Sequence, residues 1–364
     1  MNNLSNSNVK APKHQLASLS TPAREACNVL LKRHFHPHRW LNNRHIMTIA
    51  AYFLYRNFPN AAQFSQQRIF KVAKGINVLG HCGWQADRAA APTLIIVHGL
   101  EGSSGSKYAL GTALKAYSAG FNVIRINQRG CGNTIHLSAM PYHAGLTHDL
   151  HAIIDELVLN DGISTIYLAG FSLGGNQSLK LAGEYGLSPP SSVKGICAVS
   201  VPIDLESCVK ALHWKENLLY EWNFLLSLHK SYQQRKRLHP ELYQIERPWR
   251  AVTMRQFDDL IVGPCNGFRN AEDYYTHASS AHYLTRINIP TLIIQAKDDP
   301  FIPFDMFLRT PMSQSIALLV TEKGGHVGYI SEKNESEDRY WAENRVVEFF
   351  RLLWQEQNRS SRGT

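Results

Sequence analysis

The sequence lacks the features that would place it in several large protein classes. Its six cysteines are scattered through 364 residues without a CxxC pair or a metal-ligand spacing, so we expect reduced, buried thiols and no metal site. The longest apolar run, 46–55, has about half the length of a membrane-spanning helix, and we expect it to form a buried helix. The N-terminus has no charged segment followed by an apolar core, so the sequence predicts no secretory signal and a cytoplasmic location.

Basic residues are in excess, but no nucleic-acid-binding motif accompanies them. The formal net charge is +9 at pH 7, which favours attraction to anionic surfaces such as phospholipid headgroups. RNP, zinc-finger and helix-turn-helix signatures are absent, and the densest basic stretch, 235–237, is short. We therefore expect no nucleic-acid partner, and peripheral contact with an anionic membrane surface remains open. The oligomeric state does not follow from the sequence.

From about residue 91, short apolar runs alternate with helical patterns. Each run has the length of a strand, is rich in Val, Ile and Leu, and is bounded by Gly or Asp, as in a parallel sheet covered on both faces. We predict strands at 93–97, 122–126, 165–169, 193–201, 291–295 and 315–321. We predict helices at 107–119, 147–159, 175–185 and 341–354. This alternation favours a doubly wound, mostly parallel α/β sheet.

Three segments differ from this pattern. Residues 1–20 are polar and rich in Asn and Ser, so we expect a disordered tail. We expect a single domain over 21–355 and a flexible C-terminal tail over 356–364. Within the domain, 203–288 contains no strand-like run and is aromatic, helical and basic. We interpret this interval as a helical cap inserted between two strands.

Ser172 is the candidate nucleophile. It lies at the centre of a G-x-S-x-G motif in the segment 170–176, GFSLGGN, between a predicted strand and a predicted helix. The motif alone is weak evidence, but this setting is the one that exposes a serine on a sharp strand-to-helix turn. The following helix would direct its N-terminal amides at the same point, so the Leu173 N–H is a candidate oxyanion donor. The alternative is a glycine-rich turn with an idle serine.

A second glycine-rich loop, 98–106 (HGLEGSSGS), follows the predicted strand 93–97. A loop at this position supplies the second amide of the oxyanion hole in proteins with such a serine turn, and Leu100 is the candidate donor. A phosphate-binding loop is the alternative. The phosphate-loop pattern G-x-x-x-x-G-K-[ST] is not matched, because Lys107 follows a serine.

The candidate acid follows the predicted strand 291–295. Asp298 and Asp299 stand just past its carboxyl end, where ligands gather in open α/β sheets. Asp299 precedes Pro300 and is therefore biased towards an extended backbone. We choose Asp299 as the acid and keep Asp298 as the alternative, which would otherwise cap the turn.

His326 is the candidate base among 17 histidines. It lies in GGHVG, 324–328, after the last predicted strand, and the chain order of Ser172, Asp299 and His326 is the order of α/β-hydrolases. Another group, His34, His36 and His38, could ligate zinc if the segment were extended, but Pro37 interrupts it. We expect surface packing there. Hydrolysis by serine, histidine and aspartate needs neither metal nor cofactor.

Several motifs together resemble the YheT-like hydrolases, a branch of the α/β-hydrolase superfamily. The matching segments are 40–49, 98–102, 127–132, 170–176, 296–301 and 324–329. One departure is Met47, where relatives commonly have Gln. The resemblance implies an α/β-hydrolase fold and a Ser172, Asp299, His326 triad. It also implies esterase activity on short- or medium-chain acyl esters, and in eukaryotic relatives phospholipid hydrolysis or acyl transfer to alcohols.

Two alternatives to a carboxylesterase remain at this stage. An acyltransferase would use the same triad, with an alcohol in place of water, and the sequence does not separate it from a hydrolase. A non-catalytic binding protein could keep the scaffold without the chemistry. The intact triad positions and glycine-rich loops favour an enzyme that takes a small-molecule acyl ester.

Overall fold

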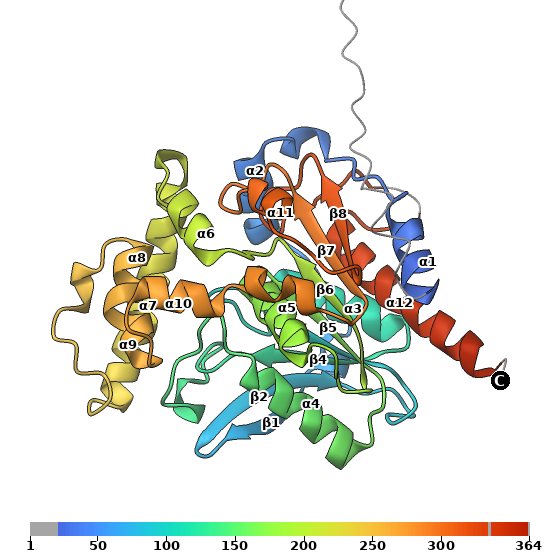
Figure 1. The fold of residues 1–364 in the computed structure, drawn as a ribbon, viewed down its shortest axis with the longest axis horizontal. Helices are drawn as coiled ribbons and strands as arrows, with labels where there is room; N and C mark the ends of the chain where they lie inside the picture. Colours follow the sequence, from blue (N-terminus) through green and yellow to red (C-terminus); the bar gives the residue numbers. More distant parts are fainter. Residues whose placement is uncertain (1–20, 334–335, 363–364) are drawn as a thin grey trace, which may run out of the picture.

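The central feature of the protein is one eight-stranded sheet. The structure, a computed structural model, describes residues 21–333 and 336–362 (Figure 1), so the tail predicted at 1–20 lies outside it. The strand order is β1-β2-β4-β3-β5-β6-β7-β8. The strands are β1 (Gln66–Ala73), β2 (Ile76–Gly83), β3 (Thr93–Val97), β4 (Asn122–Asn127), β5 (Ile166–Phe171), β6 (Val193–Val199), β7 (Thr291–Ala296) and β8 (Ile316–Thr321). Strands β3 to β8 are parallel and confirm the six predicted runs.

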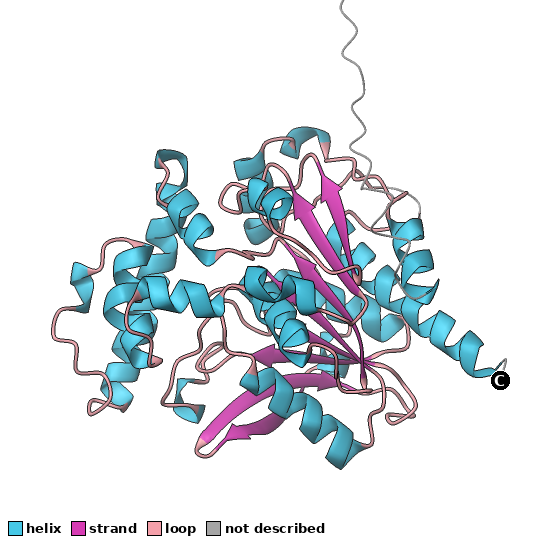
Figure 2. Cartoon of the chain, in the orientation of Figure 1, coloured by secondary structure: helices cyan, strands magenta, loops and turns pink. Residues whose placement is uncertain are grey.

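The sheet has helices on both faces (Figure 2). The principal ones are α1 (Thr21–Leu30), α3 (Lys107–Ser118), α4 (His148–Asp161), α5 (Leu173–Tyr185) and α12 (Trp341–Arg362). Side chains of α1, α3 and α12 pack in one core cluster, and those of α4 and α5 pack in another. Strand β5 supplies both clusters alternately, with Leu168 in one and Tyr167 in the other. This two-sided burial explains the continuous apolar runs in the sequence.

Strands β1 and β2 form an antiparallel hairpin that we did not predict. The hairpin pairs with β4 at the edge of the sheet, and β1 alternates between buried and exposed residues. Phe70, Val72 and Val78 face the core, while Lys71, Lys74 and Asn77 lie between them in the sequence. A half-buried edge strand with few apolar residues gives a much weaker sequence signal than a buried central strand.

Helix α12 continues through Arg362, so 356–362 is helical where we expected a flexible tail. The Arg359 guanidinium donates a 2.6 Å hydrogen bond to the Glu356 carboxylate one turn earlier. Gln357 accepts a hydrogen bond from the Tyr167 hydroxyl, which anchors this turn to the sheet. These local polar contacts extend the helix beyond the apolar stripe from which we placed its end.

The interval 203–288 is a helical insertion between β6 and β7. It contains no strand and comprises α6 (Leu205–Leu212), α7 (Leu218–Leu238), α8 (Met254–Phe257), a π-helical turn η6 (Asp258–Val262), α9 (Gly263–Cys265), α10 (Ala271–Ala278) and the 3-10 helix η7 (Ser280–Arg286), with short 3-10 turns among them. Helices α7 to α10 project to one side of the sheet in Figure 1. Helix α5 contacts η7 closely, so the end of the insertion rests on the helix that follows Ser172.

The apolar run 46–55 forms a helix, α2 (Arg44–Phe53), but our prediction that it is buried was wrong. Met47 is the one buried residue of the helix, whereas Tyr52 and Phe53 are more than 70% exposed. A narrow face of α2 packs against the rest of the protein, where Gly328 and Ile330 contact Met47. No helix in the described ranges is long and apolar enough to cross a bilayer. The six cysteines are unpaired, and all except Cys265 are buried.

Candidate active site

Ser172 occupies a strained turn between β5 and α5. Its φ of 51° and ψ of −122° lie in a region that residues with a side chain rarely adopt. The Ser172 N–H donates to the carbonyl of Val199 on β6, and its carbonyl accepts from the first turn of α5. Gly170 and Gly174 make this turn possible, because an added Cβ at either would lie within 2.4 Å of a backbone oxygen.

We expect Gly174→Ala to destabilise the protein by more than about 3 kcal/mol, since its methyl group would meet the carbonyl oxygens of Val97 and His98. The backbone of β3 and of the loop that follows it would have to shift. Gly105→Ala, in the glycine-rich loop 98–106, is the control, because the nearest atom to its methyl group is the Ser103 hydroxyl oxygen at 3.4 Å. Chemical denaturation of both variants tests this expectation. Equal stability of the two would contradict the close approach of α5 to β3.

His326 lies in a loop after β8. Hydrogen bonds and ring packing join this loop to three other segments. Its N–H donates to the Thr48 hydroxyl of α2 at 2.8 Å, and the Val327 N–H donates to Ser200 at 3.0 Å. The imidazole packs against the Phe301 ring, with centroids 4.1 Å apart. These contacts hold the ring in one position.

The two neighbouring carboxylates after β7 have different surroundings. Asp299 is buried, and its Oδ1 accepts the N–H groups of Phe301 and Ile302 at 3.2 and 3.1 Å. Its Oδ2 lies 2.9 Å from Nδ1 of His326. Asp298 instead accepts the Gly325 N–H at 3.0 Å, and burial raises the pKa of Asp298 above its usual value. Asp299 therefore contacts the imidazole, while Asp298 supports the loop that carries it.

Ser172, His326 and Asp299 form a continuous hydrogen-bonded chain, although they lie far apart in the sequence. The Ser172 Oγ is 3.0 Å from Nε2 of His326, and the other ring nitrogen faces Asp299. A carboxylate at Nδ1 keeps the proton on that nitrogen and leaves Nε2 free to accept the serine proton. The arrangement is suited to generating a serine nucleophile.

Both proposed oxyanion donors lie in segments that adjoin Ser172. Leu173 is the first residue of α5, so its N–H has no acceptor within the helix. Gly99, next to Leu100, approaches so closely that a Cβ there would be 3.0 Å from the Ser172 Cβ. The Gly99 N–H donates to the Tyr108 hydroxyl at 2.9 Å, which fixes the loop.

The buried His98 fixes the start of the loop 98–106 through two hydrogen bonds. Its Nε2 accepts the Gln128 N–H at 3.1 Å, so Nδ1 carries the proton and donates to the Gly99 carbonyl at 2.7 Å. Burial lowers the pKa of His98 to about 4. This histidine is neutral near pH 7 and acts as a structural clamp between the loop and the end of β4.

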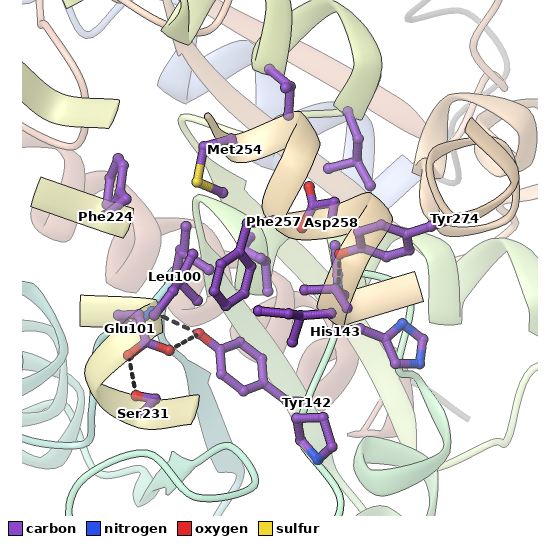
Figure 3. Close-up of a pocket in the computed structure, with 18 of the residues that line it drawn as sticks. Leu100, Glu101, Tyr142, His143, Phe224, Ser231, Met254, Phe257, Asp258 and Tyr274 are labelled. Carbon is purple, nitrogen blue, oxygen red and sulfur yellow. Dashed lines mark hydrogen bonds between the residues drawn. The ribbon is translucent and has the colours of Figure 1, made fainter. Parts of the chain in front are cut away.

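Ser172 lines a pocket whose other walls come largely from the helical insertion. Its walls are mostly apolar and aromatic, and include Leu100, Phe224, Met254, Phe257 and Tyr274, which are labelled in Figure 3. Such walls bury the hydrocarbon part of a small ligand. The pocket thus joins the serine to an environment suited to an acyl chain.

One side of the pocket carries a polar cluster around Glu101. The Tyr142 hydroxyl accepts the Glu101 N–H at 2.7 Å and donates to one carboxylate oxygen, and the Ser231 hydroxyl donates to the other at 2.7 Å (Figure 3). Glu101 has a φ of 51°, in the left-handed region. The cluster connects the loop of Leu100 to α7 and sets the position of that loop.

Asp258 is a second acidic group in the pocket wall. It accepts the Tyr275 hydroxyl at 2.7 Å, and burial raises the pKa of Asp258 to about 7. Because the folded state holds this proton more tightly than the unfolded chain, the associated stability is present at low pH and is lost as the pH rises from about 4 through 7.

We therefore expect the stability of the wild type, relative to Asp258→Asn, to fall by a few kcal/mol between pH 4 and pH 8. The asparagine keeps an acceptor for Tyr275 and does not titrate. Contributions from buried histidines occur in both proteins and cancel in the difference. Urea unfolding at several pH values measures this quantity, and a difference that stays constant with pH would contradict the assignment.

The structure brings together every residue that we selected from the sequence, and it adds residues that we missed. Thr48 and Ser200 position the His326 loop, and Glu101 lines the pocket. Asn176 donates to the carbonyls of Ala144 and Ala278 and so ties α5 to the insertion. Thr48, Glu101 and Asn176 lie inside motifs that we had noted, whereas no local pattern marks Ser200.

The sheet order, the serine on its strained turn and the insertion after β6 together define an α/β hydrolase. A family model described as "alpha/beta hydrolase fold" matches residues 92–333. The chain belongs to this superfamily, and within it to the YheT-like hydrolases, as the motifs indicated. It is 32% identical over 327 residues to "Putative esterase YheT" of Escherichia coli (strain K12), covering 86% of this chain and 92% of that protein.

Two more distant similarities are to a lipase sequence and to a solved esterase structure. The "Monoacylglycerol lipase" of Saccharomyces cerevisiae (strain ATCC 204508 / S288c) is 28% identical over 276 residues, which cover 73% of this chain and 60% of that protein. The solved structure of the Pyrococcus furiosus esterase Pf2001 covers 81% of this chain and 95% of its own, with a TM-score of 0.52 and 17% identity. At that identity the structural likeness concerns the fold.

Proposed function

We propose that the protein is a serine carboxylesterase that cleaves short- to medium-chain acyl esters through an acyl-enzyme on Ser172. The observation that carries the proposal is the hydrogen-bonded chain from Ser172 through His326 to Asp299, beside a mostly apolar pocket. Relatives named as an esterase and as a monoacylglycerol lipase support ester substrates.

In the first half of the reaction, the Ser172 Oγ bonds to the ester carbonyl carbon while Nε2 of His326 accepts its proton. The carbonyl electron pair moves to oxygen, where the Leu100 and Leu173 amides stabilise the charge. Collapse of this intermediate expels the alcohol, which takes the proton from His326. Asp299 stabilises the imidazolium and holds its orientation.

In the second half, water enters in place of the alcohol. His326 takes a proton from the water as its oxygen attacks the acyl carbon, and the Leu100 and Leu173 amides again hold the oxyanion. Breakage of the bond to Ser172 releases the carboxylic acid, and the serine recovers its proton. No step needs a cofactor.

A panel of p-nitrophenyl esters from acetate to palmitate tests the proposal. We expect turnover of the short and medium chains and a fall towards palmitate, because the acyl chain has to fit a pocket whose walls include the bulky side chains of Phe257 and Tyr274. Adding an alcohol and measuring ester against acid products distinguishes hydrolysis from acyl transfer. Failure to cleave any member of the panel, or formation of transfer product alone, would contradict the carboxylesterase assignment.

A further inference from the structure

Two helices beside the His326 loop present apolar side chains to solvent. On α2 these are Ile46, Ile49 and Tyr52, and on α7 they are Leu219, Trp222 and Leu226. The spacing of three or four residues places each set on one face of its helix. Leu219 and Trp222 are 79% and 62% exposed. The outer face of a surface helix is normally polar, so this pattern needs an explanation.

The two apolar faces belong to one surface. Arg44 of α2 forms a 2.6 Å ion pair with Glu216, and His45 lies 3.2 Å from the Tyr220 hydroxyl with its ring stacked on the tyrosine. In Figure 1, α2 and the turn between α6 and α7 both lie along the upper edge of the molecule. We call the exposed apolar side chains of 40–55 and 214–226 the α2–α7 surface.

This surface is rich in the residues that anchor proteins at membrane interfaces. The chain has seven tryptophans, and three of them, Trp40, Trp214 and Trp222, lie on the α2–α7 surface with between 49% and 72% of each exposed. Tryptophan is usually well buried in a soluble protein. Its rings, like those of tyrosine, are favoured at the boundary between headgroups and acyl chains.

Basic residues predominate in the segment that carries α2. Residues 26–86, which include α2, contain no Asp or Glu. Arg39 is exposed and lies over the Trp40 ring, 5.1 Å from its centroid, and Lys215 is exposed beside Trp214. Of the acidic residues next to the surface, Glu216 forms an ion pair with Arg44, and Glu332 accepts the Arg39 N–H at 2.8 Å. Cations next to exposed aromatic rings complement an anionic lipid surface.

The inner sides of the same helices reach the candidate active site. Thr48 of α2 accepts the N–H of His326, and Tyr220 of α7 packs against Phe301, which contacts the His326 ring. Phe224 of α7 lines the pocket. Helix α7 therefore has the pocket on one side and the exposed apolar face on the other.

From these observations we propose that the α2–α7 surface docks on a bilayer that contains anionic phospholipid. The exposed aliphatic and aromatic side chains enter the interfacial region, and Arg39 and Lys215 pair with lipid phosphates. Docking does not depend on ester cleavage. If the proposed esterase function is also correct, docking brings the pocket next to a membrane that can supply acyl esters.

The experiment uses the full-length Ser172→Ala protein, so that lipid hydrolysis does not interfere, and unilamellar vesicles of phosphatidylcholine with or without phosphatidylglycerol. We expect co-flotation with the anionic vesicles, a blue shift of tryptophan emission, and weaker binding as salt is raised. The outcome is independent of the esterase proposal, because the parent variant is inactive by design. Absence of binding to anionic vesicles would overturn the docking proposal.

A matched pair of variants locates the contact. In the same background, Leu219→Ser with Trp222→Ser should weaken vesicle partitioning by about tenfold or more. Leu159→Ser with Leu187→Ser, at sites 81% and 91% exposed near the far ends of α4 and α5, should leave it unchanged. Melting temperatures check that both variants fold. Equal binding by all three proteins would overturn the proposal, as would a parent that self-associates through this surface and does not bind vesicles.

Discussion

Replacing Ser172 with alanine is expected to lower kcat for a soluble p-nitrophenyl ester by about 10⁴-fold or more. The substitution removes the Oγ that lies 3.0 Å from Nε2 of His326, and with it the atom that would carry the acyl group. The oxyanion donors and the pocket are unaffected, so residual binding of the ester remains. Steady-state kinetics with purified protein measures the loss.

Ser227→Ala is the control for this substitution. The Ser227 hydroxyl donates to the Asn223 carbonyl in its own helix, and its loss should change kcat by less than about twofold. If Ser172→Ala kept more than a tenth of the wild-type kcat, the hydrolysis would have to use another nucleophile.

The second large effect is expected for Asp299→Asn, which should lower kcat by about 10⁴-fold. The Phe301 and Ile302 N–H groups bind Oδ1, so the amide oxygen takes that position and the NH₂ group faces His326. The NH₂ group donates to Nδ1 and forces the imidazole proton onto Nε2. A protonated Nε2 cannot accept the Ser172 proton.

Asp298→Asn is the matched control one residue away. Its amide oxygen can still accept the Gly325 N–H, so we expect a loss smaller than about tenfold. Comparison of the two kcat values decides between the neighbouring carboxylates. The opposite order, with the larger loss at Asp298, would assign the role of the acid to that residue.

The parts of the fold that could be predicted were those with a strong local pattern. Buried parallel strands such as β3 and β5 are continuous apolar runs, and their ends fell within one or two residues of the predicted limits. The β1–β2 hairpin was missed because only one of its faces is buried. Our prediction that α2 is buried was wrong. A run of apolar residues does not show whether the helix packs against the rest of the protein or faces solvent.

The candidate site could be predicted because its residues lie in turns directly after strands, and chain order assigns their roles. The supporting contacts could not, because they join distant segments. Thr48 reaches His326 across 278 positions, and the Ser231 hydroxyl reaches Glu101 across 130. Neither a serine nor a threonine in a helix carries a signal for such a partner. These residues become visible only when the chain is folded.

Labelling with a fluorophosphonate probe, followed by peptide mass spectrometry, tests the central claim most directly. The probe reacts with a serine only where a base activates it and an oxyanion site receives the phosphoryl oxygen. We predict one adduct per chain, on the peptide that contains Ser172, and none in Ser172→Ala. A folded wild-type protein that stays unlabelled, or that is labelled on a different residue, would contradict the account.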